Sequence, residues 1–449
     1  MAFEDLAALS RNDRVRMAVL VIAVLAAVLW ASAQFLQPGP QRRIVLASGA
    51  ESGVYHQHAL RYKELLAREG VAVDVRITGG AGENLHLLRD PKSSVDVAFT
   101  QGGVATVPEA DGLVMLASLY YEPLWIFYRD PATLSQIKQL QGKRIAIGTA
   151  GSGTRALVAQ LFAAQGMSLA GGIGRGNTDL VALGGGDALR ALKAGEIDAA
   201  LYVGGADTPI IQQTLRDPAI KLMNLTHADA YPRRIPFLTK LTLPYGTIDL
   251  ATNTPDQDVV MIGTKAMLVA RDDFHPALIN LLIDAAREIH GRQGYFEVAG
   301  EFPGTTQVDD IPVSPYADQH KRFGSSFLYR YLPFWLATYA ERALILIIPL
   351  VVILVPLLNL LPLLLRWRVR SRIYRWYREL ASLERDVATR QGTLPVEKWL
   401  QDLDRVEHAV EQIHTPASYA SEAYTLREHI GLVRRNILAK AAGSASPAR

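Results

Sequence analysis

The sequence predicts an α/β fold with two similarly built lobes, together with two transmembrane helices and an α-helical C-terminal tail. Three observations lead to this prediction. Strand and helix patterns alternate through residues 42–325, as in a parallel sheet covered by helices. A similar order of motifs occurs twice, first from residue 44 and again from residue 144. Apolar stretches long enough to span a bilayer flank this region on both sides.

The composition supports a folded protein and excludes several kinds of site. The 449 residues, of which 49% are hydrophobic and 20% charged, suffice for two or three folding units. The formal net charge is only +3, and no basic stripe with interleaved aromatic residues is present, so we expect no nucleic-acid partner. Cysteine is absent, which excludes disulfides, thiolate metal sites, a cysteine nucleophile and a lipoprotein anchor.

The first apolar stretch, residues 17–36, allows two interpretations. It is long enough for a transmembrane signal anchor that follows a cytoplasmic N-terminus at residues 1–16. Ala31-Ser32-Ala33 also fits the cleavage site of a signal peptide. In both interpretations residues 38–340 are exported.

The second apolar stretch, residues 343–365, predicts a transmembrane helix. Asn359 is its one clearly polar residue, and its three prolines are tolerated in lipid. Trp335, Tyr339 and Trp367 stand where an aromatic belt lies, and six arginines follow within residues 366–378. Because such a cluster marks the cytoplasmic side, we expect a cytoplasmic tail and spans that contact membrane lipid.

The exported domain begins with a β-α-β-α-β pattern. Short apolar or alternating runs predict its strands, and apolar residues with helical spacing predict its helices. The predicted strands are 44–48, 71–77 and 95–99, and the helices between them are 54–68 and 83–88.

The same pattern returns in residues 144–203. The predicted strands are 144–148, 180–183 and 198–203, and the predicted helices are 154–165 and 187–194. Short motifs recur in order: Ser-Gly-Val at 52–54 with Ser-Gly-Thr at 152–154, Thr-Gly-Gly at 78–80 with Gly-Gly-Gly at 184–186, and Val-Asp-Val-Ala at 95–98 with Ile-Asp-Ala-Ala at 197–200. We therefore expect one lobe at about 42–120 and 257–325, a second at about 123–254, and a cleft between them.

Two glycine turns at helix starts form the candidate binding site. The first amides of a helix lack partners and carry partial positive charge, so a small anion fits there. The predicted contacts are Gly49, Ser52, Gly53 and Tyr55 in the first lobe, and Ser152, Gly153, Thr154 and Arg155 in the second. The alternative is that the hydroxyls only cap ordinary turns.

A second pair of turns and two strand ends complete the candidate site. Gly79, Gly80 and Asn84 in the first lobe correspond to Gly184, Gly185 and Gly186 in the second, and Gln101 and Tyr202 end the third strand of each lobe. Glu51 would repel an anion unless it points to solvent or faces an ammonium group. The latter case favours an amino-acid-like ligand.

No catalytic site, metal site or cofactor is predicted. His56 and His58 are two residues apart at a helix start and point to different faces, so zinc is not expected. Nucleophile and nucleotide motifs are absent, and the glycines at 171–176 and 184–186 lack the spacing of a dinucleotide fingerprint. The sequence therefore predicts a protein that is not an enzyme.

The sequence of the tail predicts three helices within residues 366–440. Breaks are expected at 392–395 and 414–416. Apolar residues recur at three- and four-residue spacing: Val396, Leu400, Leu403, Val406, Val410 and Ile413, then Leu426, Ile430, Val433 and Ile437. Such spacing predicts a bundle that either packs on itself or mediates partner binding or self-association. Residues 441–449 are expected to be disordered.

At these motifs the chain resembles the TAXI family, the solute receptors of TRAP-type transporters. The matching stretches lie within about residues 42–300 and include ASGAESGVYHQHAL at 47–60, ITGGAGENLHLL at 77–88, VDVAFTQ at 95–101 and AGEIDAALYVGG at 194–205. The resemblance implies a class II periplasmic binding protein fold with a two-strand hinge, crossing at 120–122 and returning near 253–259. It implies short dicarboxylate or glutamate-like ligands and a TRAP-type membrane subunit as partner.

The resemblance also places six residues in the cleft: Tyr55, Gly79, Asn84, Gln101, Ser152 and Thr154. Two features depart from the family, namely Ala50-Glu51 in place of smaller residues in the first turn, and the C-terminal span with its tail. We expect a bacterial inner-membrane protein whose main domain is periplasmic and binds a small carboxylate or amino-acid solute. The tail makes a membrane-anchored sensor the alternative to a transport receptor.

Overall fold

A computed structural model describes residues 11–34, 38–105, 107–167, 178–308, 311–389, 395–412 and 420–444. The chain divides into two compact units, one formed by residues 38–340 and the other by the N-terminal segment with residues 341–449. The predicted tail breaks at 392–394 and 414–416, the glycines at 171–176 and residues 1–10 lie outside the described residues.

The first lobe contains the predicted β-α-β-α-β order, with element ends shifted by at most two residues. The elements are β1 (Arg43–Ala47), α3 (Val54–Arg68), β2 (Ala72–Arg76), α4 (Ala81–Arg89) and β3 (Val97–Gln101). Strand β1 pairs in parallel with both β2 and β3, so the local strand order is β2-β1-β3.

The second lobe repeats this arrangement. Its elements are β5 (Arg144–Ala146), α5 (Gly153–Ala164), β6 (Asp179–Val181), α6 (Gly185–Ala194) and β7 (Ala199–Val203). Strand β5 pairs in parallel with β6 and β7, which gives the order β6-β5-β7. The repetition predicted from the sequence is therefore present in the sheet topology, since the two lobes have the same strand order. Smaller elements complete the domain: η1 (Val107–Glu109), η2 (Ile137–Leu140), α7 (Pro209–Leu215), β8 (Lys221–Leu222), α8 (Ala230–Arg234) and β9 (Thr239–Leu243).

Two long strands, β4 (Leu113–Tyr128) and β10 (Val259–Arg271), join the lobes. Up to Pro123, β4 pairs with β10; from Leu124 it pairs with β7. The crossing on β4 therefore falls at Glu122–Pro123, next to the predicted 120–122. The predicted return at 253–259, and the end of the second lobe at 254, are too early. β10 still pairs with β9 until Gly263, so the return crossing lies at Gly263–Thr264.

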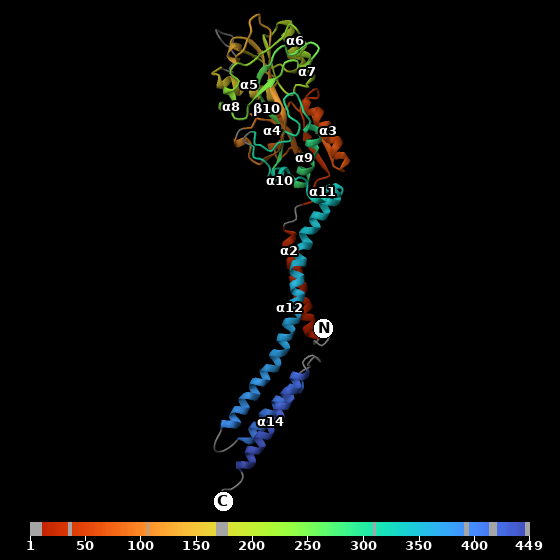
Figure 1. Ribbon diagram of the computed structural model, residues 1–449, viewed down its shortest axis with the longest axis vertical. Coiled ribbons are helices and arrows are strands. Elements are labelled where there is room, and N and C mark those ends of the chain that lie inside the picture. Colours follow the sequence, from red (N-terminus) through yellow and green to blue (C-terminus); the bar gives the residue numbers. More distant parts are fainter. Residues whose placement is uncertain are drawn as a thin grey trace. The chain divides into compact units, whose positions relative to one another are not determined.

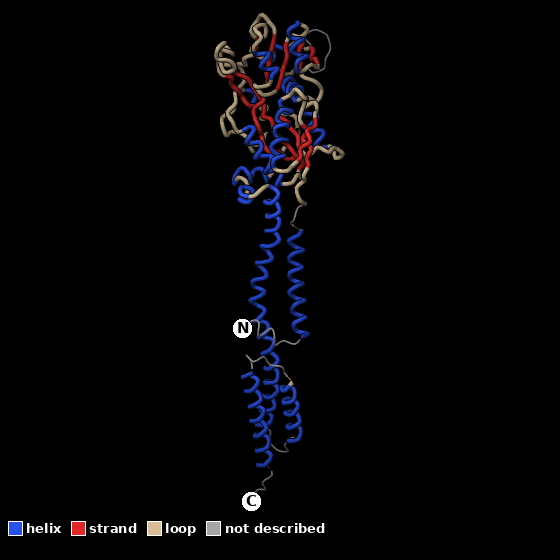
Figure 2. Tube along the Cα trace, turned by 90° about the vertical axis from the view of Figure 1, so that its right-hand side faces the viewer, coloured by secondary structure: helices blue, strands red, loops and turns tan. Residues whose placement is uncertain are grey.

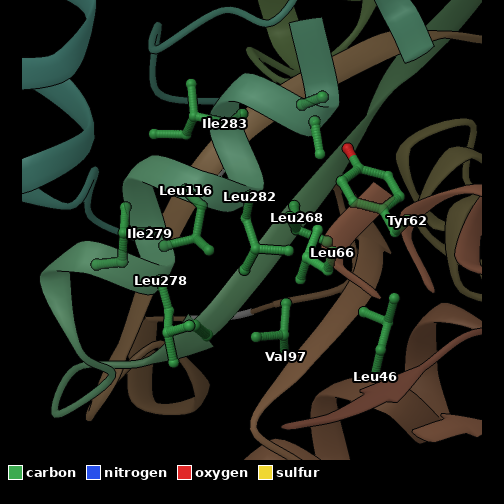
Figure 3. Packing of buried hydrophobic residues seen from close by; sticks show 14 of the residues in the cluster. Leu46, Tyr62, Leu66, Val97, Leu116, Leu268, Leu278, Ile279, Leu282 and Ile283 are labelled. Atoms are coloured by element: carbon green, nitrogen blue, oxygen red, sulfur yellow. The ribbon is translucent and has the colours of Figure 1, made fainter. Parts of the chain in front are cut away.

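The core of the first lobe lies between the sheet and two helices, α3 and α9 (Pro276–His290). On α9, Leu278, Leu282 and Ala286 recur at four-residue spacing and are fully buried, as expected for a helix with one apolar face. Figure 3 shows Leu278 and Leu282 facing Leu66 of α3 and the strands. In Figure 1, α3, α9 and α10 (Pro315–Phe323) gather at one end of the domain, and α5 to α8 at the other.

One described helix is long and apolar enough to cross a membrane. Residues Phe334–Leu357 of α12 (Phe334–Thr389) have a mean hydropathy of 2.3, and the most apolar 18-residue window within them is not buried. In the N-terminal helix α2 (Arg11–Ala33), the apolar part Ala18–Ala33 is shorter than a typical span. The C-terminal stretch is therefore a candidate span by length and composition, and both predicted spans remain predictions.

The tail is helical throughout its described residues (Figure 2). The end of α12 packs with α13 (Val396–Glu411) and α14 (Ala420–Ser444) around a separate apolar core. All four predicted core residues of the last helix, from Leu426 to Ile437, are buried there, together with Trp399, which the spacing argument missed. The prediction of disorder from residue 441 is wrong for 441–444, since α14 continues to Ser444.

Candidate functional site

A small cavity lies between the lobes at the point where β4 crosses. Its volume is about 170 Å³, below the range of about 300–1,000 Å³ typical of pockets for drug-sized ligands. It is lined by Gly49, Ala50, Gly53, Val54, Tyr55, Gly80, Ala81, Gln101, Glu122, Ser152, Gly153, Thr154, Val203, Gly204 and Thr208. Both lobes contribute residues to its wall, and its volume could hold only a small molecule.

The N-termini of α3 and α5 both open onto this cavity. Gly53 precedes α3 without a side-chain cap, and the first residues of the helix, Val54 and Tyr55, line the cavity. In the second lobe Ser152 precedes α5, and its hydroxyl accepts a hydrogen bond from the Arg155 amide. Two helix ends of the same polarity therefore bring partial positive charge to one small space.

Eight predicted site residues line the cavity: Gly49, Gly53, Tyr55, Gly80, Gln101, Ser152, Gly153 and Thr154. Eight others from the prediction do not line it: Ser52, Gly79, Asn84, Arg155, Gly184, Gly185, Gly186 and Tyr202. Ser52, in the turn before α3, and Arg155, in the first turn of α5, are both exposed. The cation expected from Arg155 is therefore absent from the cavity wall.

Asn84 and Tyr202 have structural roles instead. The Asn84 amide donates to the carbonyl oxygens of Ser48 and Phe99, at 2.6 and 2.7 Å, and accepts from the Thr78 hydroxyl. It thereby ties α4 to β1 and β3. The Tyr202 hydroxyl donates to the Gly185 carbonyl at 3.2 Å. This bond turns the ring toward α6, so Tyr202 packs in the core of the second lobe.

The lobes contact each other at the mouth of the cavity. The amides of Gly82 and Glu83, at the start of α4, donate to the Gly151 carbonyl at 3.1 and 3.3 Å. The Gln101 side chain donates to the Gly153 carbonyl at 3.2 Å. The glycine turn at 79–80 was expected to bring the amides at the start of α4 to a ligand. In the structure these amides donate hydrogen bonds to the opposite lobe instead.

Glu122, on the crossing strand β4, is the cavity residue that the sequence argument placed only at the hinge. Its side chain is 3% exposed, and its Oε2 accepts a hydrogen bond of 2.9 Å from the Tyr55 hydroxyl. Burial raises the Glu122 pKa to about 8, although the Tyr55 hydrogen bond opposes this shift. A single acidic residue within the otherwise uncharged run 113–128 was the signal that could have found it.

Tyr55 holds the Glu122 carboxylate in place. Its ring stacks on Phe99 with centroids 5.3 Å apart, and its hydroxyl also lies 3.1 Å from the Thr100 carbonyl. Thr154 is fixed similarly in the second lobe, where its hydroxyl accepts from the Val203 amide at 3.1 Å. The Thr154 hydrogen remains available to a ligand.

The architecture defines the class of this domain. Two α/β lobes with parallel sheets, joined by two crossing strands into one curled sheet and enclosing a small cavity, form a periplasmic binding protein-like fold. The chain belongs to the NMT1-like family, which residues 46–290 match.

Several solved structures are similar to part of this chain at low sequence identity. The periplasmic aliphatic sulphonate binding protein SsuA from Escherichia coli is 15% identical, with 57% of this chain and 74% of that chain covered and a TM-score of 0.37. The alkanesulfonate-binding protein SsuA from Xanthomonas axonopodis pv. citri, bound to MOPS, is 14% identical over 56% and 74%, also with a TM-score of 0.37. An ancestral arginine-binding protein bound to arginine is 12% identical over 56% and 92%, with a TM-score of 0.35.

Proposed function

We propose that this protein is an extracytoplasmic receptor that captures a small carboxylate or amino-acid solute between its lobes and delivers it to a TRAP-type transporter. The observation that carries the proposal is the cavity at the hinge, onto which one helix N-terminus from each lobe opens. Such a site binds rather than transforms: among the residues that line it, none forms a nucleophile–base pair. The TAXI-like motifs and the candidate span Phe334–Leu357 support a membrane-tethered member of that receptor class.

The proposal is tested by ligand capture with the full chain in detergent. Native mass spectrometry identifies any small molecule that co-purifies, and a thermal-shift panel of organic acids and amino acids follows. The Gly153→Ala variant should weaken the response, because an added Cβ would lie 2.1 Å from Gln101 Oε1 and would displace that side chain from the cavity wall. Gly186→Ala is the matched control, since nothing lies within 4 Å of its added Cβ. The proposal fails if no ligand binds the wild type, or if Gly153→Ala binds it unchanged.

A second candidate function is ligand sensing through the cytoplasmic tail. The supporting observation is the continuity of α12, a single helix of 56 residues. Its first residue, Phe334, is buried in the core of the binding domain, and Leu380 and Val387 near its end are buried in the core of the tail. A movement at one end of this continuous helix can reach the other end along the helix.

The two functions are separated by disrupting the tail. Ile430→Asp places a charge in the tail core, where Ile430 is fully buried, whereas Leu432→Asp on the same helix changes a side chain that is 44% exposed. If the protein is a transport receptor, solute uptake should survive both changes. If it is a sensor, the response to the solute should be lost with Ile430→Asp and kept with Leu432→Asp.

A further inference from the structure

Among the described residues that line the cavity, Glu122 is the only one of the acidic and basic types: none is lysine, arginine or histidine, and Glu122 is the single carboxylate. Glu122 also forms no ion pair among the described residues; the Tyr55 hydroxyl is the partner it has. A buried carboxylate without a cation is unfavourable. A proton or a positively charged ligand group must therefore compensate it.

The positive end of the cavity is formed by backbone rather than by side chains. The first turns of α3 and α5 face the same space as Glu122. Helix N-termini carry only partial positive charge, and among the described residues no amide of α3 or α5 donates a hydrogen bond to Glu122, whose carboxyl is bound by Tyr55. A solute that carries both charges satisfies both ends of the cavity at once.

We propose that Glu122 is the specificity-determining residue of the cleft, and that it selects a solute with a protonated amine, an amino acid rather than a dicarboxylate. The inference rests on the proposed receptor function and names the substrate class of the same site. The ammonium group of the solute donates to the Glu122 carboxylate, and the solute carboxylate lies at the amides of α3 and α5. If Glu122 is protonated before binding, its proton is released to solvent when the ammonium group arrives.

The charge state of Glu122 gives the two ligand classes opposite pH dependences. Burial raises the Glu122 pKa to about 8, so below that pH the empty site holds a proton that an ammonium ligand must displace. Affinity for an amino acid should therefore rise as pH increases toward about 8 and then level off. Affinity for an acid that lacks the amine should fall above about pH 8, when Glu122 becomes charged and unpaired.

The groups around Glu122 do not titrate in that range. Burial raises the pKa of Tyr55 on α3 and of Tyr120 on β4 well above the usual value. On β10 the residue opposite Glu122 is Thr264, and Lys265 beside it lies over the Tyr121 ring. His58, in contact with Tyr120, has its pKa lowered by burial to about 4. Two further acids, Asp207 and Glu297, lie close enough to Tyr120 to raise its pKa.

The test compares matched pairs of ligands that differ only in the amine: L-glutamate with glutarate, L-alanine with propionate, and L-leucine with 4-methylpentanoate. Calorimetric titration of the full chain in detergent at about pH 6 and about pH 9 gives the affinities. We expect the amino member of the bound pair to be favoured at least about tenfold, and Glu122→Gln to remove that preference. If the member without the amine binds as tightly or more tightly, and Glu122→Gln changes nothing, the inference is wrong while the receptor function stands. If no member of any pair binds and no solute co-purifies, both fail.

Tyr55→Phe provides a second variant that retains the carboxylate. It removes the hydrogen bond that lowers the Glu122 pKa, so the preference for the amine should persist and the pH at which affinity levels off should move upward. This readout remains available if Glu122→Gln does not fold. An unchanged pH profile in Tyr55→Phe would show that the proton is held elsewhere and would overturn the role given to Glu122.

Discussion

Glu122 shows how one buried side chain can govern both stability and binding. In β4 it stands between apolar and aromatic neighbours, and it is 3% exposed. Placing a carboxylate there has a cost in free energy, because the strand offers no cation and the Tyr55 hydroxyl is its hydrogen-bond partner. Buried ionisable groups with this kind of energetic cost are common at functional sites, where a ligand interacts with the group.

The first prediction concerns the pH dependence of stability. A carboxyl whose pKa rises from 4.5 when unfolded to about 8 when folded contributes stability that is complete below about pH 4.5 and is lost as pH rises through about 8. Glu122→Gln has no such loss. Between about pH 6.5 and pH 8 the wild type should therefore lose on the order of 1–2 kcal/mol of unfolding free energy relative to the variant.

Melting curves of both proteins without ligand, measured through this range, check the prediction. Burial lowers the pKa of His58 to about 4 and that of His290 well below its usual value. Their effect appears as pH falls below about 6.5, on the acid side of the tested range. Parallel pH profiles for the wild type and Glu122→Gln would contradict the raised pKa.

Asn84 gives a second residue-scale prediction, which separates structure from binding. Asn84→Ala removes the partner of two buried carbonyls and of the Thr78 hydroxyl, so unfolding free energy should fall by about 3 kcal/mol. Ligand affinity, measured well below the melting temperature, should be unchanged because Asn84 does not line the cavity. If Asn84→Ala instead lowered ligand affinity and left the unfolding free energy unchanged, Asn84 would be a ligand-binding residue and the prediction would be wrong.

Among the elements, the start of α4 decides how closely the lobes approach. Gly82, the second residue of α4, lies against the opposite lobe, and a Cβ added there would be 2.9 Å from the Gly151 carbonyl oxygen. Gly186, the second residue of α6, has free space at the same position. The two glycines are thus equivalent in helix position and differ in their surroundings.

Gly82→Ala should therefore weaken ligand binding by about tenfold or more, because the added methyl group holds the lobes apart. Gly186→Ala should leave affinity unchanged and stabilise the helix by about 0.5–1 kcal/mol. Titration of both variants with the same ligand, together with melting curves, checks the pair. Equal affinities in the two variants would mean that binding does not require the contact of Gly82 with Gly151.

For the whole molecule, the central prediction is topological. The chain has no cysteine, so a single introduced cysteine reports the side of the membrane on which it lies. Leu250 in the binding domain is 82% exposed and Tyr424 in the tail is 67% exposed. In cells whose outer barrier admits the reagent, Leu250→Cys should react with a membrane-impermeant maleimide, and Tyr424→Cys should react only after the inner membrane is permeabilised. Labelling of both under the first condition would contradict a cytoplasmic tail.

The sequence by itself determined the order and type of the elements in the two β-α-β-α-β units, their repetition in two lobes, and the apolar stripe from Leu426 to Ile437. These features follow from hydrophobic periodicity and turn residues, which act over a few neighbouring positions. Gly53, Tyr55, Ser152 and Thr154 were found for the same reason, since they follow directly from where each helix begins.

Only the tertiary structure decided which of the candidates share the cavity. It placed Arg155 outside, used Asn84 to tie β1 and β3 to α4, and brought Glu122 against Tyr55 across 67 residues of sequence. It also fixed the return crossing at Gly263–Thr264, because pairing with β9 extends β10 in the second lobe. The physical reason is that the charge of a cavity depends on side chains brought together by long-range strand pairing, which local periodicity does not encode.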